Sequence, residues 1–210
     1  MGNKTNHKNK NFNNECNVNN VNNVNNVNNE NNVNNVNKNK TNINKNSYKV
    51  VLLGESCTGA KTSLINRITK NIFSACILTT ISPDFKTKKI QMDNGKEVIL
   101  RLWDTVGQER YRTITLEQGK KADCVVLGYD ITRKEEFINI KNYWYPIFKH
   151  IKLIYLIGNK CDLIDRREVS EKEASNFAKE NNLRFFEISC KENKGINEFF
   201  NDLSNEIIKY

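Results

Sequence analysis

The sequence predicts an α/β fold of three layers: a mostly parallel, six-stranded sheet with one antiparallel edge strand, covered by helices on both faces. Apolar runs typical of buried strands alternate with amphipathic stretches typical of helices, and this order favours parallel strands joined by helical crossovers. One pair of runs is separated only by Asp93-Asn94-Gly95, and Asn-Gly supplies the positive φ angles of a tight hairpin turn. This hairpin accounts for the antiparallel strand.

The apolar runs predict strands at residues 48–53, 85–92, 98–103, 124–129, 153–157 and 184–188. The first strand leads through a glycine-containing turn into a helix, the second and third flank the hairpin turn, and the others alternate with helical stretches. Helices are expected at residues 61–69, 108–120, 134–149, 171–181 and 196–209. Ligands of such a sheet bind outside the carboxyl ends of its strands.

Residues 1–46 differ from the rest of the chain, because they hold 24 asparagines and a ladder of Val-Asn-Asn triplets. A period of three fits neither a helix nor a strand, and isolated valines among amides bury too little surface to offset the entropy of ordering. We therefore expect a disordered, Asn-rich N-terminal extension at 1–46 and a single domain at 47–210. A partner-binding arm is the alternative interpretation of the extension.

Charge and cysteine content limit the class of protein. The net charge of +9 favours acidic partners such as nucleotide phosphates, nucleic acid or an anionic membrane. The six cysteines form no Cys-x-x-Cys pair, which indicates reduced thiols rather than disulfides or a zinc site. No apolar stretch reaches membrane-spanning length, and the N-terminus has no hydrophobic signal segment.

The turn after the first strand, residues 54–62, has the composition of a phosphate-binding loop. Backbone N–H groups of such a loop and the N-terminus of the following helix bind phosphates. Lys61 is expected to reach the β- and γ-phosphates, and Thr62 to place its hydroxyl on Mg²⁺. The expected nucleotide-binding residues are Glu55, Ser56, Cys57, Thr58, Gly59, Ala60, Lys61, Thr62 and Ser63.

This loop departs from the usual G-x-x-x-x-G-K-[ST] spacing, because Ala60 stands between Gly59 and Lys61. One extra residue adds up to about 3.8 Å of chain, so we expect the loop to bulge at Cys57-Thr58. The alternative is an ordinary strand–turn–helix connection.

A second motif, Asp104-Thr105-Val106-Gly107-Gln108-Glu109, follows the third strand. A carboxylate at a strand end suits Mg²⁺ bound through a water, so Asp104 is a candidate metal residue. Gly107 lets a backbone N–H approach the γ-phosphate, and Gln108 is the candidate catalytic residue that orients the attacking water. Thr80 is a candidate second hydroxyl ligand of Mg²⁺. A capped helix start and an exposed strand-edge threonine are the alternatives.

The base-recognition motif is Asn159-Lys160-Cys161-Asp162, after the fifth strand. Guanine presents a ring N–H and an exocyclic amine side by side, and a fixed Asp162 carboxylate can accept from both. Adenine cannot make this pair and would leave the carboxylate unpaired, which costs about 1–3 kcal/mol. Ser189-Cys190-Lys191 follows the last strand, where its backbone can also contact the base.

The order and spacing of these motifs resemble those of Ras-superfamily small GTPases, and the Rab branch most of all. The Rab-like stretches are Ile81-Ser82-Pro83-Asp84-Phe85, Arg101-Leu102-Trp103-Asp104-Thr105, residues 108–115 and Tyr129-Asp130-Ile131-Thr132. The resemblance implies the P-loop NTPase fold of a small G domain, and a GTP/GDP switch that requires Mg²⁺. It also implies that Phe73 packs edge-on against guanine and that the stem of Lys160 covers the base.

The resemblance further implies a slow GTPase that acts with an exchange factor, a GTPase-activating protein and effectors, as a monomer in vesicle trafficking. Several residues depart from the family pattern: Val106 replaces an alanine, Gln118-Gly119 replaces a tyrosine pair, and Ser82-Pro83 replaces Gly-Val. Ala60, Val106 and the Gln118-Gly119 pair keep a nucleotide-binding scaffold with little hydrolysis open as an alternative. A nucleic-acid binder is disfavoured, because aromatic and basic residues do not interleave.

The expected location is the cytoplasm, with at most peripheral attachment to endomembranes. As written, the sequence ends at Tyr210 without a cysteine in a C-terminal tail, so prenylation is not expected. Gly2 could be myristoylated, but the M-G-x-x-x-[ST] pattern requires Ser or Thr where this chain has Asn6.

Overall fold

The computed structural model describes residues 45–55, 60–75, 80, 84–92, 95–106 and 112–210, and all structural statements below concern these residues. The compact unit that contains every helix and strand spans Asn42–Tyr210. The domain boundary at residue 47 remains a prediction.

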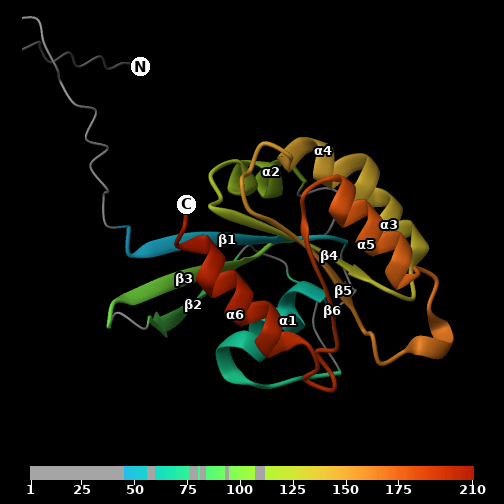
Figure 1. Cartoon of the computed structure of the whole chain (residues 1–210), viewed down its shortest axis with the longest axis horizontal. Coiled ribbons are helices and arrows are strands. Elements are labelled where there is room, and N and C mark those ends of the chain that lie inside the picture. Colours follow the sequence, from blue (N-terminus) through green and yellow to red (C-terminus); the bar gives the residue numbers. More distant parts are fainter. Residues whose placement is uncertain (1–44, 56–59, 76–79, 81–83, 93–94, 107–111) are drawn as a thin grey trace, which may run out of the picture. The chain divides into compact units, whose positions relative to one another are not determined.

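A single six-stranded sheet with the order β2-β3-β1-β4-β5-β6 forms the centre of this unit (Figure 1). Its strands are β1 (Ser47–Leu53), β2 (Asp84–Gln91), β3 (Glu97–Asp104), β4 (Cys124–Asp130), β5 (Ile154–Asn159) and β6 (Arg184–Ile188). Only the β2–β3 pair is antiparallel, and β2 lies at the edge. The predicted sheet is therefore confirmed, although residues 93–94 of the hairpin turn lie outside the described part of the chain.

Helices cover both faces of the sheet. They are α1 (Ala60–Lys70), α2 (Arg112–Lys120), α3 (Lys134–Asn139), α4 (Tyr145–Phe148), α5 (Glu171–Glu180) and α6 (Ile196–Ile207), with a π-helical turn η2 (Ile140–Trp144) and a 3₁₀ turn η3 (Ile164–Arg166). Alternate residues of β1 point to opposite faces, so Val50 packs with Leu64 of α1, and Val51 packs with Phe137 of α3. Figure 1 shows α1 and α6 on one side of the sheet and α3, α4 and α5 on the other. The three-layer prediction is confirmed.

The expectation of one regular helix at 134–149 is wrong in detail, because the path is interrupted by η2. Pro146 lacks a backbone N–H, and its ring would clash with the carbonyl four residues earlier in a regular helix. The Tyr145 N–H instead reaches back five residues to the Ile140 carbonyl. The sequence contained this signal in Pro146.

Smaller differences occur at element ends. β5 runs from Ile154 through Asn159, later than the predicted 153–157, because Asn159 still pairs with Asp130 of β4 and Ile188 of β6. α6 ends at Ile207, two residues before the predicted end. α2 is described from Arg112 onward, so the predicted helical residues 108–111 lie outside the described part.

Cys124, Cys161 and Cys190 are buried free thiols. Across the described ranges, the helices are all too short or too polar to traverse a lipid bilayer.

Candidate nucleotide-binding site

The predicted motifs meet at the carboxyl edge of the sheet. β1 ends before the loop that begins at Gly54, β3 ends at Asp104, β5 ends at Asn159, and β6 ends just before Ser189. Because β1, β3, β5 and β6 share one direction, these ends lie at the same edge. This edge is where parallel α/β sheets bind ligands.

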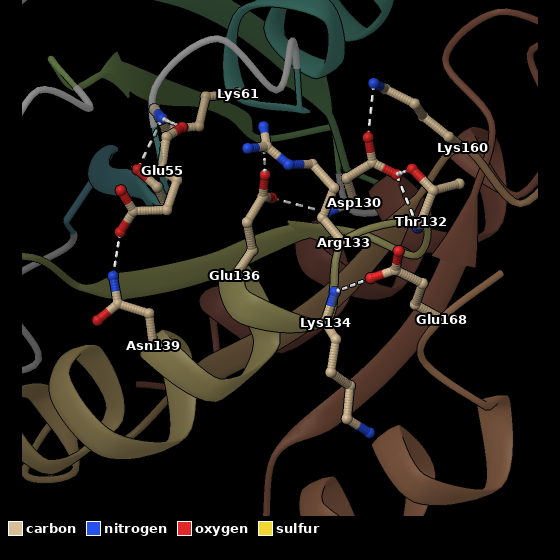
Figure 2. Close-up of polar contacts among 11 residues, drawn as sticks. Glu55, Lys61, Asp130, Thr132, Arg133, Lys134, Glu136, Asn139, Lys160 and Glu168 are labelled. Atoms are coloured by element: carbon tan, nitrogen blue, oxygen red, sulfur yellow. Dashed lines mark hydrogen bonds and ion pairs between the residues drawn. The ribbon is translucent and has the colours of Figure 1, made fainter. Parts of the chain in front are cut away.

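Lys61 lies at the start of α1, and its ammonium group turns back onto the preceding loop. Its Nζ donates to the carbonyl oxygens of Gly54 at 2.8 Å and Glu55 at 2.6 Å (Figure 2). The side chain is buried, and its positive charge lies at the N-terminal end of α1. Both the ammonium group and the helix N-terminus attract an anion.

Three side chains that could each bind a metal ion through oxygen come together beside Lys61, and each comes from a separate segment. The Thr62 hydroxyl donates to Asp104 Oδ2 at 2.7 Å, and the Thr80 hydroxyl lies 3.4 Å from the same oxygen. The two hydroxyl oxygens are 3.4 Å apart. The structure therefore brings together all three predicted metal residues.

The chemistry of these donors fits Mg²⁺. Hydroxyl and carboxylate oxygens are hard ligands, which Mg²⁺ prefers, and it usually keeps several waters. Asp104 Oδ1 is buried without a hydrogen-bond partner among the described residues, so it can accept from a metal-bound water. Burial raises the pKa of Asp104, while hydrogen bonds from Thr62 and the charge of Lys61 oppose this shift. A bound cation would favour the ionised form further.

The base-recognition residues are joined across β5 and β6. Asn159 Oδ1 accepts from the backbone N–H groups of Lys160 at 2.8 Å and Cys190 at 3.2 Å. Asp162 Oδ1 accepts from the Ser189 hydroxyl at 2.6 Å. The Ser189 bond orients the Asp162 carboxylate and holds it next to the loop that follows β6.

Lys160 forms an ion pair that sequence reasoning missed. Its Nζ lies 2.6 Å from Asp130 Oδ2, and Asp130 is buried at the end of β4 (Figure 2). The other Asp130 oxygen accepts from the backbone N–H of Thr132 at 2.9 Å and from its hydroxyl at 2.7 Å. Asp130 thereby fixes the head of Lys160, which is expected to cover the base with its stem. The Asp-x-Thr pattern at a strand end was the available signal.

A second buried carboxylate, Glu136 of α3, lies behind Asp130. Its Oε2 accepts from the Asp130 backbone N–H at 3.0 Å, and its Oε1 lies 3.1 Å from the Arg133 guanidinium. Burial raises the pKa of Glu136 to about 7, against the opposing effects of these two groups. Nothing in the sequence pattern singled out this residue.

Glu55 connects the phosphate-binding loop to two helices. Its carboxylate contacts the Asn139 side-chain amide of α3 (Figure 2). The Arg112 guanidinium of α2 lies 3.9 Å from the same carboxylate. Arg112 also lies over the Tyr143 ring, with its central carbon 4.5 Å from the ring centroid. Glu55 therefore interacts with α2 and α3 and not only with solvent.

The remaining predicted residues are placed as follows. Ser63 is buried in α1, and Phe73 is 39% exposed. The Lys191 carbonyl accepts from Arg67. Ala60 is the first residue of α1, so the extra residue starts the helix. Ser56, Cys57, Thr58, Gly59, Gly107 and Gln108, and with them the expected bulge at 57–58, lie outside the described residues.

Comparisons with known proteins agree with this geometry. The Ras family model matches residues 49–209. The Ras-related protein Rab-13 of Mesocricetus auratus is 38% identical over 164 residues, which cover 77% of this chain and 80% of that protein. Human Ras-related protein Rab-8B is also 38% identical over 164 residues, which cover 78% of its length.

A fungal relative matches to a similar degree. The GTP-binding protein ypt2 of Schizosaccharomyces pombe is 40% identical over 164 residues, covering 77% of this chain and 81% of that protein. The family model covers β1 from its third residue onward and every later element through α6. The family model and these relatives lead to one conclusion: the chain belongs to the Ras family of small GTPases and has the P-loop fold of a small G domain.

Proposed function

We propose that this protein is a Rab-like GTP/GDP switch that binds guanine nucleotide with Mg²⁺ and hydrolyses GTP to GDP and phosphate. The observation that carries the proposal is the meeting of Thr62, Thr80 and Asp104 beside the Lys61 ammonium group. Mg²⁺ requires hard oxygen ligands, and a phosphate requires a nearby positive charge such as that of the buried Lys61 ammonium group.

Each side of the site has a separate role in the proposal. Lys61 would pair with the β- and γ-phosphates, and Thr62, Thr80 and Asp104 would hold Mg²⁺, with Asp104 acting through a water. Mg²⁺ would neutralise charge that develops on the phosphate oxygens. Asp162 would accept from the two guanine N–H groups while Ser189 holds its other side, and Gln108 would orient the attacking water.

By analogy with related switches, intrinsic turnover would be about 10⁻⁴–10⁻³ s⁻¹, and an activating protein could supply an arginine to accelerate it. The proposed biological role is the recruitment of effectors in vesicle trafficking, with an exchange factor to reload GTP. We place the protein in the cytoplasm or peripherally on endomembranes.

A nucleotide-binding scaffold with little hydrolysis is the second candidate. It is favoured by the extra residue before Lys61 and by Gln118-Gly119 in place of a tyrosine pair. Val106 supports it less, because its side chain is buried among other protein atoms and its carbonyl accepts from Thr115 at 3.3 Å.

Titration of the purified full-length chain with fluorescent GDP, with and without Mg²⁺, tests binding, and single-turnover release of phosphate from GTP tests hydrolysis. We expect tight binding that weakens when Mg²⁺ is removed and when Asp104 is replaced by Asn. Arg101→Gln is the matched control, because Arg101 is exposed and bonds to Ser47 Oγ, away from the site. Binding without phosphate release, even with an activating protein, would favour the scaffold. No binding at millimolar GTP and Mg²⁺ would contradict both candidates.

A further inference from the structure

Arg67, in the last turns of α1, is bonded to the loop that follows β6. Its Nε donates to the Cys190 carbonyl at 2.6 Å, and one terminal nitrogen donates to the Lys191 carbonyl at 2.9 Å. More than 120 residues separate Arg67 from these partners in the sequence. Hydrogen bonds from a guanidinium group are charge-assisted, and its planar fork fixes the direction of both carbonyls.

The N–H groups of the same loop are bonded to base-recognition residues. The Cys190 N–H donates to Asn159 Oδ1 at 3.2 Å, and the Glu192 N–H donates to Ser189 Oγ at 3.0 Å. Ser189 Oγ in turn donates to Asp162. The loop is thus held from two sides: Arg67 binds two of its carbonyls, and the Asn159–Asp162 motif accepts from the Cys190 N–H and the Ser189 hydroxyl.

The bond from Arg67 to the Cys190 carbonyl also sets the direction of the Lys191 N–H, because both groups belong to one peptide unit. In a trans peptide the C=O and N–H groups point in opposite directions, and the described peptide bonds include no cis form. Because Arg67 binds the Cys190 carbonyl, the Lys191 N–H of the same peptide points away from Arg67. Within the proposed function, an N–H donor at this position would match the carbonyl oxygen of guanine, whereas adenine carries an amine at that ring position.

Arg67 also holds the segment that leads to Phe73. Its second terminal nitrogen donates to the Asn71 carbonyl at 3.1 Å. Asn71 has a left-handed backbone, with φ of 54°, which ends α1 and turns the chain. The Arg67 guanidinium carbon lies 5.9 Å from the centroid of the Phe73 ring, within the range of a cation–π contact.

We propose that Arg67 is a positioning residue for guanine recognition: it fixes the 190–191 carbonyls and the 71–73 segment so that the loop presents the Lys191 N–H to the base. The inference rests on the proposed guanine-nucleotide function. Arg67 acts through the loop and Phe73 rather than by touching the nucleotide. Lysine cannot replace it, because a single ammonium nitrogen cannot reproduce the three separate guanidinium nitrogens that bind the Cys190, Lys191 and Asn71 carbonyls.

The test uses the full-length protein with Arg67→Gln and Arg67→Lys, and Arg101→Gln as a control of equal charge change. The readouts are the dissociation rate of fluorescent GDP at fixed Mg²⁺ and the ratio of GTP to ATP in competing for the site. We expect dissociation from both Arg67 variants to be at least about tenfold faster, as for the loss of a charge-assisted hydrogen bond. The GTP-to-ATP preference should fall, and Arg101→Gln should stay within about twofold of wild type.

A purely structural role for Arg67 predicts a different pattern. It would lower the melting temperature of the apo protein while leaving the GTP-to-ATP ratio unchanged, and this result would overturn the inference. We expect the single-turnover hydrolysis rate of bound GTP to be unchanged, because the described contacts of Arg67 lie with the 190–191 loop, Asn71 and Phe73. If Arg67→Gln does not fold, Arg67→Lys alone decides by the same two readouts. Failure of the wild type to bind guanine nucleotide would overturn the proposed function as well, whereas normal wild-type binding with unaltered variants would overturn only the role of Arg67.

Discussion

Asp162 is the residue on which base selectivity depends in the proposed function. Its carboxylate is fixed by the Ser189 hydroxyl at 2.6 Å, so its direction is set before a ligand binds. Preorganised acceptors discriminate strongly, because a ligand without matching donors leaves them unpaired.

We predict that Asp162→Asn shifts base preference away from guanine, because an amide cannot accept from two adjacent N–H groups. Affinity for GDP should fall by at least about tenfold, as expected for the loss of a charged acceptor. Competition of fluorescent GDP with GTP, ATP and xanthosine triphosphate measures the preference. Asp165→Asn, in the neighbouring turn η3, is the control. Unchanged guanine preference in Asp162→Asn would show that the base site is misassigned.

Glu136 is a buried carboxylate that makes stability depend on pH. The groups facing it are the Asp130 N–H, the Arg133 guanidinium, and the Asp130 and Glu55 carboxylates, and burial raises its pKa to about 7. Since its pKa is higher in the folded than in the unfolded chain, the folded protein binds more protons between the two values. The contribution of Glu136 to stability is therefore lost as pH rises from about 4.5 to about 7.

We predict that Glu136→Gln stabilises the protein above pH 7 by about 1–3 kcal/mol and has little effect near pH 4.5. The glutamine oxygen still accepts from the Asp130 N–H and carries no charge. Urea unfolding of both proteins across this pH range measures the difference. Glu135→Gln, at the adjacent position of the first turn of α3, is the matched control. A difference that does not vary with pH would contradict the assignment.

At the scale of elements, the packing of α2 against α4 explains why glycine stands at position 119. A Cβ atom on Gly119 would lie 2.3 Å from Cε1 of the buried Phe148 ring. Phe148 is the last residue of α4, and its ring packs near that of Trp144. The glycine thus leaves space for a core ring, at one of the positions where the family usually carries a tyrosine pair.

We predict that Gly119→Ala destabilises the protein by about 1–3 kcal/mol, because the overlap forces Phe148 to move. Without the overlap, the same change in a helix would stabilise it by about 1 kcal/mol. A double-mutant cycle with Phe148→Leu tests the cause by urea denaturation. The cost of Gly119→Ala should shrink in the Phe148→Leu background, and an equal cost in both backgrounds would contradict the packing explanation.

For the whole molecule, two described contacts lie just before the predicted domain boundary at residue 47. The Asn46 carbonyl accepts from the Ile99 N–H of β3 at 2.8 Å, and Lys45 forms an ion pair with Asp123. Both contacts extend the β1 edge toward the N-terminus by two residues.

We predict that a chain of residues 45–210 unfolds with the same free energy as the full-length protein. A chain of residues 47–210 should be less stable by about 1 kcal/mol, because the Asn46 bond contributes about 0.5–1.5 kcal/mol and the exposed ion pair little. Urea denaturation of the three proteins measures these values. A large loss in the 45–210 chain would contradict the proposed extension at 1–46.

Much of the site could be predicted because its signals are local. Three motifs can each be recognised from a few neighbouring residues: the turn at 54–62, Asp104 after an apolar run, and Asn159-Lys160-Cys161-Asp162. Parallel strands carry such motifs to one sheet edge whatever the strand order, so the sequence was sufficient to predict that they meet.

The contacts of Arg67, Asp130, Glu136 and Gly119 were decided only by the tertiary structure. Two partners of Arg67, Cys190 and Lys191, lie more than 120 residues away, and no local pattern encodes which helix end faces which loop. The role of a buried charge or of a glycine depends on the groups packed around it, and these groups come together only when the chain has folded.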